Sequence, residues 1–210
     1  MGVRDPFLER MTVIPLGDDV LEGLFHRGQR IPPCLILPPL PELGGSMETP
    51  VCIELSWALS RAGHATLRFN YRGVGASTGR RPDDLDLVED VGAGVEQLVT
   101  TVEVPRVCLV GYSFGAFVGA AAALRDPRVS HLVLVAPPTR RYAFDWPALA
   151  ARDLRLHAIF AEHDDYCDRE ATSAAVISAG GAISLVLDAD HFFSCGLDRV
   201  GRLAAEAVAR

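Results

Sequence analysis

Short apolar runs alternate with longer amphipathic stretches along nearly the whole chain. The apolar runs are rich in β-branched residues, which predicts buried strands at residues 12–14, 21–25, 34–37, 65–69, 107–110, 132–135, 156–160 and 183–187. The stretches between them predict helices at residues 51–62, 84–102, 116–124, 169–179 and 196–210. Strands and helices that alternate in this order predict a mostly parallel sheet covered by helices on both faces.

The first two strands are expected to form an antiparallel hairpin, because Gly17-Asp18-Asp19 between them is a turn sequence. The whole pattern therefore predicts an α/β fold with a twisted sheet of about seven to eight strands. Ser46 stands where a cap for helix 51–62 is expected. No internal repeat, low-complexity tract or linker divides the chain, so residues 1–210 are expected to form a single domain.

The pentapeptide Gly111-Tyr112-Ser113-Phe114-Gly115 lies between a predicted buried strand and a predicted buried helix. In that setting Gly-x-Ser-x-Gly is typical of a nucleophile elbow, a sharp turn that exposes a serine hydroxyl at the edge of a sheet. The turn is so tight that the positions two residues before and after the serine must lack bulky side chains. Ser113 is therefore the predicted nucleophile.

A serine nucleophile needs a base with a pKa near 7, and the ligand side of a parallel sheet is the carboxyl end of its strands. His191 fits this place, because it follows the last predicted strand in a loop before the final helix. His163 also follows a strand, but it stands where the acidic partner is expected. The other histidines lie in the hairpin, at a helix end or at the amino-terminal ends of strands: His26, His64, His131 and His157.

The acidic partner is expected just after strand 156–160, where Asp164 and Asp165 are adjacent. Either gives the chain order Ser–Asp–His, which is one of the known orders of a catalytic triad. The carboxylate that is not used, and Asp168, are expected to serve in a turn or as a helix N-cap. A metal site fits less well, because His163-Asp164-Asp165 lacks ligands at a useful spacing.

An oxyanion hole needs two N–H donors, one of them directly after the nucleophile, which is Phe114. The second is expected from the loop after strand 34–37, which begins Pro38-Pro39-Leu40-Pro41. Proline has no N–H group, so Leu40 is the only backbone donor among these four residues.

The composition narrows the possible partners. Apolar residues make up 49% of the chain and charged residues 22%, as is ordinary for a soluble enzyme. The net charge of −7, without any basic run, argues against nucleic acid and anionic membranes. All 20 basic residues are arginine, which excludes lysine chemistry. No metal or organic cofactor is implied.

Targeting signals and cysteine usage point to the cytoplasm. Residues 1–10 carry charges and a proline, unlike a secretory leader. No apolar run reaches the roughly 18 residues that a membrane span requires. The five cysteines form no C-x-x-C pair, which favours a reduced compartment in which they act as small buried side chains.

Four ordered motifs give the chain a family resemblance: residues 44–47 (GGSM), 68–77 (RFNYRGVGAS), 111–116 (GYSFGA) and 190–193 (DHFF). With these, the chain resembles the α/β-hydrolase superfamily, in particular short, lid-poor bacterial serine hydrolases described as predicted esterases. The resemblance begins near Cys34. It implies that the acid follows Ala161 by three residues, which selects Asp164. Relatives usually open the oxyanion loop with histidine, where this chain has Pro38.

The resulting hypothesis is a serine hydrolase that cleaves a small-molecule ester or thioester through an acyl-enzyme. The alternatives are an acyltransferase, a cyclase or lyase on a specialised metabolite, and a binding module with an idle triad. The segment 140–146 is the expected partial cover of a shallow cleft, also bordered by residues 40–43 and 71–74. Arg72, Tyr142 and Trp146 are the predicted substrate contacts. The sequence leaves the oligomeric state open.

Overall fold

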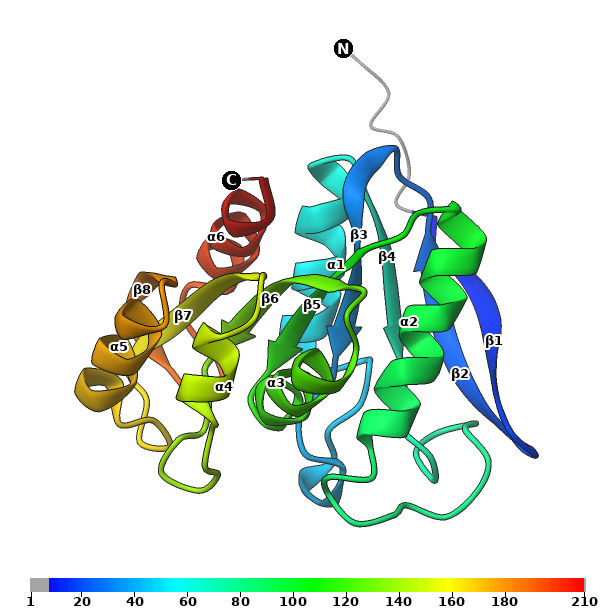
Figure 1. The fold of residues 1–210 in the computed structure, drawn as a ribbon, viewed down its shortest axis with the longest axis horizontal. Coiled ribbons are helices and arrows are strands. Elements are labelled where there is room, and N and C mark those ends of the chain that lie inside the picture. Colours follow the sequence, from blue (N-terminus) through cyan, green and yellow to red (C-terminus); the bar gives the residue numbers. More distant parts are fainter. Residues whose placement is uncertain (1–7, 210) are drawn as a thin grey trace.

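An eight-stranded sheet runs through the centre of the molecule (Figure 1), in the strand order β1-β2-β4-β3-β5-β6-β7-β8. The computed structural model describes residues 8–209. Residues 1–7 and Arg210 therefore lie outside the described residues. The former belong to the stretch predicted to lack a leader, and the latter ends the last predicted helix. The strands are β1 (Arg10–Leu16), β2 (Asp19–His26), β3 (Arg30–Leu37), β4 (His64–Phe69), β5 (Val107–Tyr112), β6 (Val129–Val135), β7 (Arg155–His163) and β8 (Ala182–Asp190).

The sheet is parallel except at its amino-terminal edge. Strand β2 pairs antiparallel with both β1 and β4, whereas β4, β3, β5, β6, β7 and β8 run parallel. The predicted hairpin and the mostly parallel sheet are both confirmed. Strand β5 lies between β3 and β6, so the loops that follow these three strands meet at one edge of the sheet.

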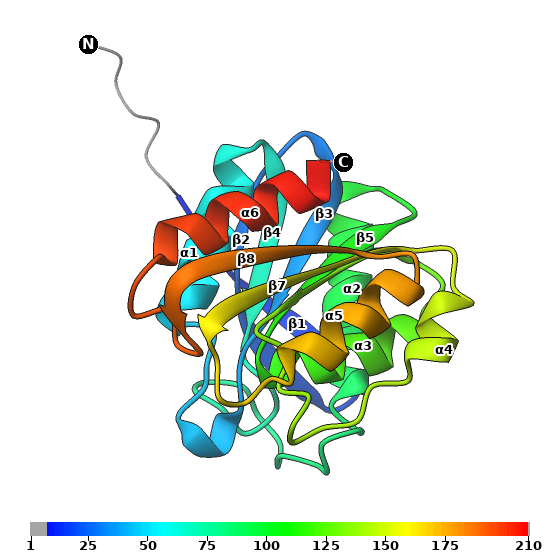
Figure 2. The ribbon, with the colours of Figure 1, turned by 90° about the vertical axis from the view of Figure 1, so that its left-hand side faces the viewer.

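Helices cover both faces of the sheet (Figure 2). The helices are α1 (Pro50–Arg61), α2 (Val88–Val102), α3 (Phe114–Arg125), α4 (Trp146–Ala150), α5 (Arg169–Ser178) and α6 (Leu197–Ala209). Helices α1 and α6 bury side chains such as Leu55 and Val200 in one core, while α2 to α5 bury side chains such as Val95 and Val118 in the other. Within residues 8–209, no helix combines the length and apolar character that crossing a membrane needs.

One predicted helix start and one predicted helix cap were wrong. Helix α2 begins at Val88 rather than at residue 84, because Asp84 lies in a turn and pairs with Arg81 at 2.6 Å. Ser46 does not cap α1: its Oγ accepts a hydrogen bond from the Glu48 N–H at 3.2 Å, and α1 begins later, with a proline in its first turn. Sequence analysis also missed α4 and a single 3-10 turn, η1 (Pro41–Leu43).

Candidate active site

Ser113 occupies a strained turn between β5 and α3. Its backbone angles, φ 54° and ψ −118°, lie in a region that non-glycine residues rarely adopt. A backbone of this kind costs about 1–3 kcal/mol and persists only where its surroundings enforce it. Here the Ser113 N–H donates to the carbonyl of Val135 at the end of β6, at 2.8 Å.

Close packing explains both glycines of the elbow. A Cβ atom on Gly111 would come within 2.3 Å of the Gly115 carbonyl oxygen. A Cβ atom on Gly115 would come within 2.3 Å of the Leu37 carbonyl oxygen and 2.7 Å of that of Pro38. The second contact also shows that the end of β3 packs directly on the elbow. The loop that follows β3 is thereby held beside Ser113.

Three side chains predicted from the sequence meet at the carboxyl edge of the sheet. Ser113 Oγ lies 2.8 Å from Nε2 of His191, which follows β8. Nδ1 of His191 lies 2.9 Å from each carboxylate oxygen of Asp164, which follows β7. The side chains of His191 and Asp164 are only 7% and 2% exposed. Because a carboxylate can only accept, Nδ1 carries the proton and Nε2 is free to accept from the serine hydroxyl.

The backbone and ring of His191 are held on several sides. The Tyr112 hydroxyl donates to the His191 carbonyl at 3.1 Å, and the ring of Tyr166 lies 4.5 Å from the imidazole between centroids. Asp190 shapes the same loop by accepting hydrogen bonds from the N–H groups of Phe192 and Ser194. The bond from Ser194 is the main reason that the pKa of the Asp190 carboxyl lies below its usual value. Sequence analysis assigned Asp190 no role.

The neighbouring acids are placed differently from Asp164. Asp165 is exposed. Asp168 caps α5, because its side chain accepts from the Ala171 N–H at 3.2 Å, which confirms the predicted N-cap. Asp164 also accepts from the Tyr166 N–H at 2.8 Å, so its carboxylate is fixed by two partners.

The two residues predicted to supply the oxyanion N–H groups are Phe114 and Leu40. Phe114 is the first residue of α3, where N–H groups have no partner within a helix. Leu40 stands directly before η1 in extended conformation, at φ −60° and ψ 117°. Both residues line the same cleft as Ser113. Across residues 8–209, neither N–H donates a hydrogen bond.

The loop of residues 38–49, which we call the oxyanion loop, is clamped by the motif on β4. Asn70 Oδ1 accepts from the Met47 N–H at 2.7 Å, and Arg68 Nη1 donates to the Met47 carbonyl at 2.7 Å. Gly45 donates to the Leu40 carbonyl at 3.0 Å, and a Cβ atom on Gly45 would come within 2.4 Å of the Pro39 carbonyl oxygen. The motifs at residues 44–47 and 68–77 thus hold the loop that carries the Leu40 N–H.

The cleft above Ser113 has a volume of about 400 Å³. One wall is the oxyanion loop, and the other is the segment of residues 137–146, which we call the cover loop. Tyr142 lines the cleft as predicted, but Trp146 does not, because its ring stacks on Phe144 at 5.0 Å in the first turn of α4. The predicted border at residues 71–74 is absent from the lining.

Arg72, the third predicted substrate contact, also lies away from the cleft lining. Its backbone N–H and its Nε both donate to the carboxylate of Asp90, at 2.8 and 2.7 Å, and Nη2 donates to Glu89 at 3.1 Å. Asp90 is fully buried on α2. The prediction is corrected: Arg72 neutralises a buried carboxylate and ties its loop to α2.

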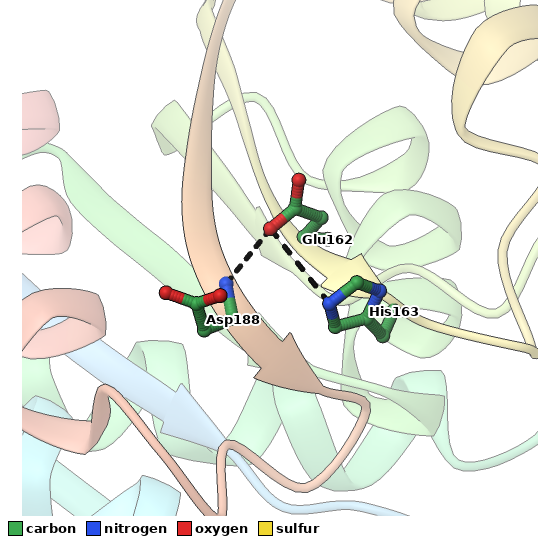
Figure 3. A group of neighbouring side chains, drawn as sticks. All are labelled: Glu162, His163 and Asp188. Carbon is green, nitrogen blue, oxygen red and sulfur yellow. Dashed lines mark hydrogen bonds and ion pairs between the residues drawn. The ribbon is translucent and has the colours of Figure 1, made fainter.

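A cluster of possible metal ligands was missed by the sequence analysis. Figure 3 shows Glu162, His163 and Asp188, whose ligand atoms lie within 4.8 Å of one another at the ends of β7 and β8. Glu162 Oε2 already accepts the Asp188 N–H at 2.8 Å and lies 3.8 Å from His163 Nε2. Asp188 has a positive φ of 58°. These contacts join the ends of β7 and β8 where their register shifts, and His163 is exposed.

Comparison with known proteins identifies the family. A sequence model of the α/β hydrolase fold matches residues 33–164. The chain belongs to the α/β-hydrolase family. The solved structure of an α/β serine hydrolase homologue from Coxiella burnetii superposes on this α/β hydrolase with a TM-score of 0.80. It is 27% identical, and the match covers 94% of this chain and 96% of that one.

Two sequence relatives extend the comparison. An uncharacterised protein of Rickettsia prowazekii is 26% identical over 184 residues, which are 82% of this chain and 77% of that protein. A thiohydrolase of Arthrinium phaeospermum is 29% identical over 156 residues, or 70% of this chain and 49% of that enzyme. The α/β-hydrolase fold and the likeness to a thiohydrolase support hydrolase activity.

This α/β hydrolase has a minimal lid. The connection from β6 to β7 is residues 136–154, and its only regular element is the short helix α4. The cover loop is tied to the sheet edge by backbone bonds, including Arg140 N–H to the Tyr166 carbonyl at 3.0 Å. The cleft therefore opens to solvent between two loops rather than beneath a helical cap.

Proposed function

We propose that the protein is a serine hydrolase that cleaves an ester or thioester through an acyl-enzyme. The observation that carries this proposal is the chain of contacts from Ser113 through His191 to Asp164, at 2.8 and 2.9 Å. The strained elbow and the two free N–H groups beside it add support, because acyl transfer requires both an activated nucleophile and oxyanion donors.

In the proposed reaction, Ser113 Oγ attacks the substrate carbonyl carbon while His191 Nε2 takes the hydroxyl proton. Asp164 stabilises the imidazolium that forms and keeps its ring oriented. The tetrahedral intermediate collapses when the bond to the leaving oxygen or sulfur breaks, and His191 returns its proton to that atom. Water then attacks the acyl-enzyme with His191 as the base, which releases the acid and restores Ser113.

The N–H groups of Phe114 and Leu40 would hold the oxyanion of both tetrahedral intermediates. Fixed donors of this kind are among the largest contributions to catalysis, because they need no reorganisation during the reaction. Phe114 adds the favourable field of the α3 N-terminus. The hydrogen bonds to the Met47 backbone, and the one from Gly45 to the Leu40 carbonyl, hold the loop that carries the second donor.

The open cleft favours small or short-chain acyl groups, because it encloses little apolar volume for a long chain. Likeness to a thiohydrolase supports thioesters as well as esters. A reduced cytoplasmic setting is also part of the proposal. It is supported by five free cysteines, of which Cys195 alone is exposed.

The decisive experiment combines turnover of 4-nitrophenyl butyrate with labelling by a fluorophosphonate. Ser113→Ala and His191→Ala should each lower kcat by roughly 10⁴ to 10⁶, and Ser113→Ala should abolish labelling. Asp164→Asn should cost about 10³ to 10⁴, because the wrong imidazole tautomer is then favoured.

The chain offers matched controls for two of these variants. Asp165→Asn and His163→Ala change exposed neighbours of the same residue types and should cost less than about tenfold. Activity of Ser113→Ala within tenfold of wild type would refute the nucleophile assignment. Absence of labelling in the wild type would favour a binding module. Labelling followed by acyl transfer to an added alcohol or amine would favour an acyltransferase.

A further inference from the structure

The cleft above Ser113 contains one cation that has no carboxylate partner. Glu48 and Arg141 are the two residues with full charges in its lining. Glu48 Oε1 pairs with Arg68 Nη1 at 3.1 Å, and Arg68 is itself buried. No ion pair to Arg141 is found among the described residues. Glu48 shares the charge of Arg68 with the largely buried Glu9, whereas no carboxylate among the described residues pairs with Arg141.

Two acids near Tyr142 are also paired with an arginine. Glu42 and Asp84 lie near Tyr142, where they help to raise the pKa of its hydroxyl, an effect that comes mainly from burial. Both carboxylates pair with Arg81, Asp84 at 2.6 Å. They leave Arg141 as the available partner for an anion inside the cleft.

Arg141 packs on an aromatic ring of the cover loop. Its guanidinium carbon lies 5.6 Å from the centroid of the Tyr142 ring, within the range of a cation–π interaction. That ring stacks on Phe117 at 4.5 Å and packs against Phe114 at 5.5 Å, the residue that follows the nucleophile. The backbone N–H of Arg141 also donates to the Pro138 carbonyl at 3.0 Å. Arg141 is exposed, and its guanidinium contacts the Tyr142 ring, which belongs to the wall beside Ser113.

We propose that the substrates are esters or thioesters that carry a carboxylate, and that Arg141 binds this carboxylate in the cleft. A planar guanidinium suits a carboxylate, because two parallel N–H groups can donate to its two oxygens. The proposal rests on the proposed function, since it names the substrate class of that same site. Arg141 replaces the predicted Arg72 in this role, because Arg72 binds Asp90 whereas Arg141 lines the cleft.

The test compares anionic substrates with neutral isosteres. One arm uses 4-nitrophenyl monoesters of adipic and suberic acid, with the free carboxylate or as the primary amide. The other arm places a carboxylate or a carboxamide on the leaving group of a 4-nitrophenyl butyrate. We expect kcat/KM to favour the carboxylate by roughly fivefold to twentyfold in one arm, and added salt to reduce that ratio. The arm in which the carboxylate is preferred shows whether Arg141 binds a carboxylate on the acyl group or one on the leaving group.

Variants of two adjacent arginines show whether Arg141 is the cause. Arg141→Gln should abolish the carboxylate preference. Arg141→Lys should retain part of it, because lysine keeps the positive charge but lacks the two parallel N–H donors of the guanidinium. Arg140→Gln is the matched control. Arg140 lies outside the lining, and its Nε donates to the Cys167 carbonyl at 3.2 Å, so the preference should persist. A preference unaffected by Arg141→Gln, or absent from both arms in the wild type, would overturn the proposal.

A binding measurement separates this proposal from the proposed function. Calorimetric titration with the monoamide of adipic acid should show binding to wild type and to Ser113→Ala, but weaker binding, by about fivefold or more, to Arg141→Gln. This outcome would support the carboxylate site even if no ester were hydrolysed. Equal affinity in all three proteins would refute it even if Ser113 proved to be the nucleophile.

Discussion

The two walls of the cleft are held in place by different physical means. The oxyanion loop depends on buried polar groups: Asn70 accepts a hydrogen bond from the Met47 N–H, and Arg68 donates one to the Met47 carbonyl. The cover loop depends on stacked rings, with Tyr142 against Phe117 at 4.5 Å and an interplanar angle of 22°. The first wall carries a proposed catalytic N–H, whereas the second carries side chains that line the cleft.

This difference matches what each wall has to do. Buried hydrogen bonds are directional and costly to break, so they fix a peptide group within tenths of an ångström. An oxyanion donor needs such placement, because its effect depends on a distance of about 3 Å. Ring stacking is broader in its geometry and gives smaller energies. Ring stacking is therefore sufficient for the cover loop, whose expected role is to bind the substrate rather than to place a catalytic N–H. The predictions below separate the two walls by their effects.

The largest effect is expected from Arg68→Met. The Nε and Nη2 atoms of Arg68 donate to the two carboxylate oxygens of Glu9, whose side chain is 9% exposed. Without the arginine, Glu9 is a buried carboxylate whose one remaining side-chain partner within residues 8–209 is the Ser56 hydroxyl. The free energy of unfolding should fall by about 3–5 kcal/mol in chemical denaturation.

A double variant tests the cause of that loss. Glu9→Gln combined with Arg68→Met removes both charges and should recover part of the lost stability, because no buried charge is left unpaired. A loss below about 1 kcal/mol for Arg68→Met, or no recovery in the double variant, would show that the network does not hold the oxyanion loop.

Asn70→Ala should have a smaller effect on stability but a clear one on catalysis. Asn70 Nδ2 also donates to Glu22 Oε1 at 2.6 Å, so the residue links Met47 to β2. Without it, the oxyanion loop shifts, and kcat should fall roughly tenfold to hundredfold with little change in KM.

Ser77→Ala is the matched control for Asn70→Ala. The Ser77 hydroxyl donates to the Asn70 carbonyl at 2.8 Å and accepts from the Glu22 N–H at 3.0 Å. It supports the backbone of Asn70, but its hydrogen bonds do not include Met47. Its removal should lower stability by about 1–2 kcal/mol while kcat changes far less. Equal losses of kcat in both variants would mean that the clamp on Met47 has no specific role.

The sequence predicts the site well where the requirement is local. The elbow needs two glycines at fixed spacing, and the clashes at Gly111 and Gly115 explain why that requirement can be recognised in five residues. The order of strands along the chain was enough to place Ser113 and His191 at one edge of the sheet. Each strand was found, because apolar runs in a buried parallel sheet are hard to mistake for loops.

The sequence is less informative where two like residues compete. Asp164 and Asp165 follow the same strand, and their residue types cannot show which one turns inward. The choice depends on the irregular register between Ala161 and His163, where β7 stops pairing regularly with β8. Only the family resemblance selected Asp164. The assignment of its catalytic role remains a prediction.

Long-range pairing explains the remaining differences. Arg72 and Arg141 both lie in loops that the sequence places at the border of the cleft, and nothing local distinguishes them. Asp90 decides between them, because it is buried on α2 and binds Arg72 across 18 positions of sequence. The Glu9–Arg68 pair spans 59 positions and joins the chain's beginning to β4. Local sequence patterns do not predict ion pairs between residues so far apart in the chain.

The smallest effects are expected from the aromatic wall, with Tyr142→Ala and Tyr142→Phe as a matched pair. Tyr142→Ala removes the ring that stacks on Phe117 and seats Arg141. KM for a short-chain ester should rise roughly threefold to tenfold with little change in kcat, and stability should fall by about 1–2 kcal/mol. Tyr142→Phe keeps the ring and should change KM less. The split between kcat and KM is then the reverse of that for Asn70→Ala. If steady-state kinetics instead show that Tyr142→Ala lowers kcat as strongly as Asn70→Ala, the two walls do not differ in function.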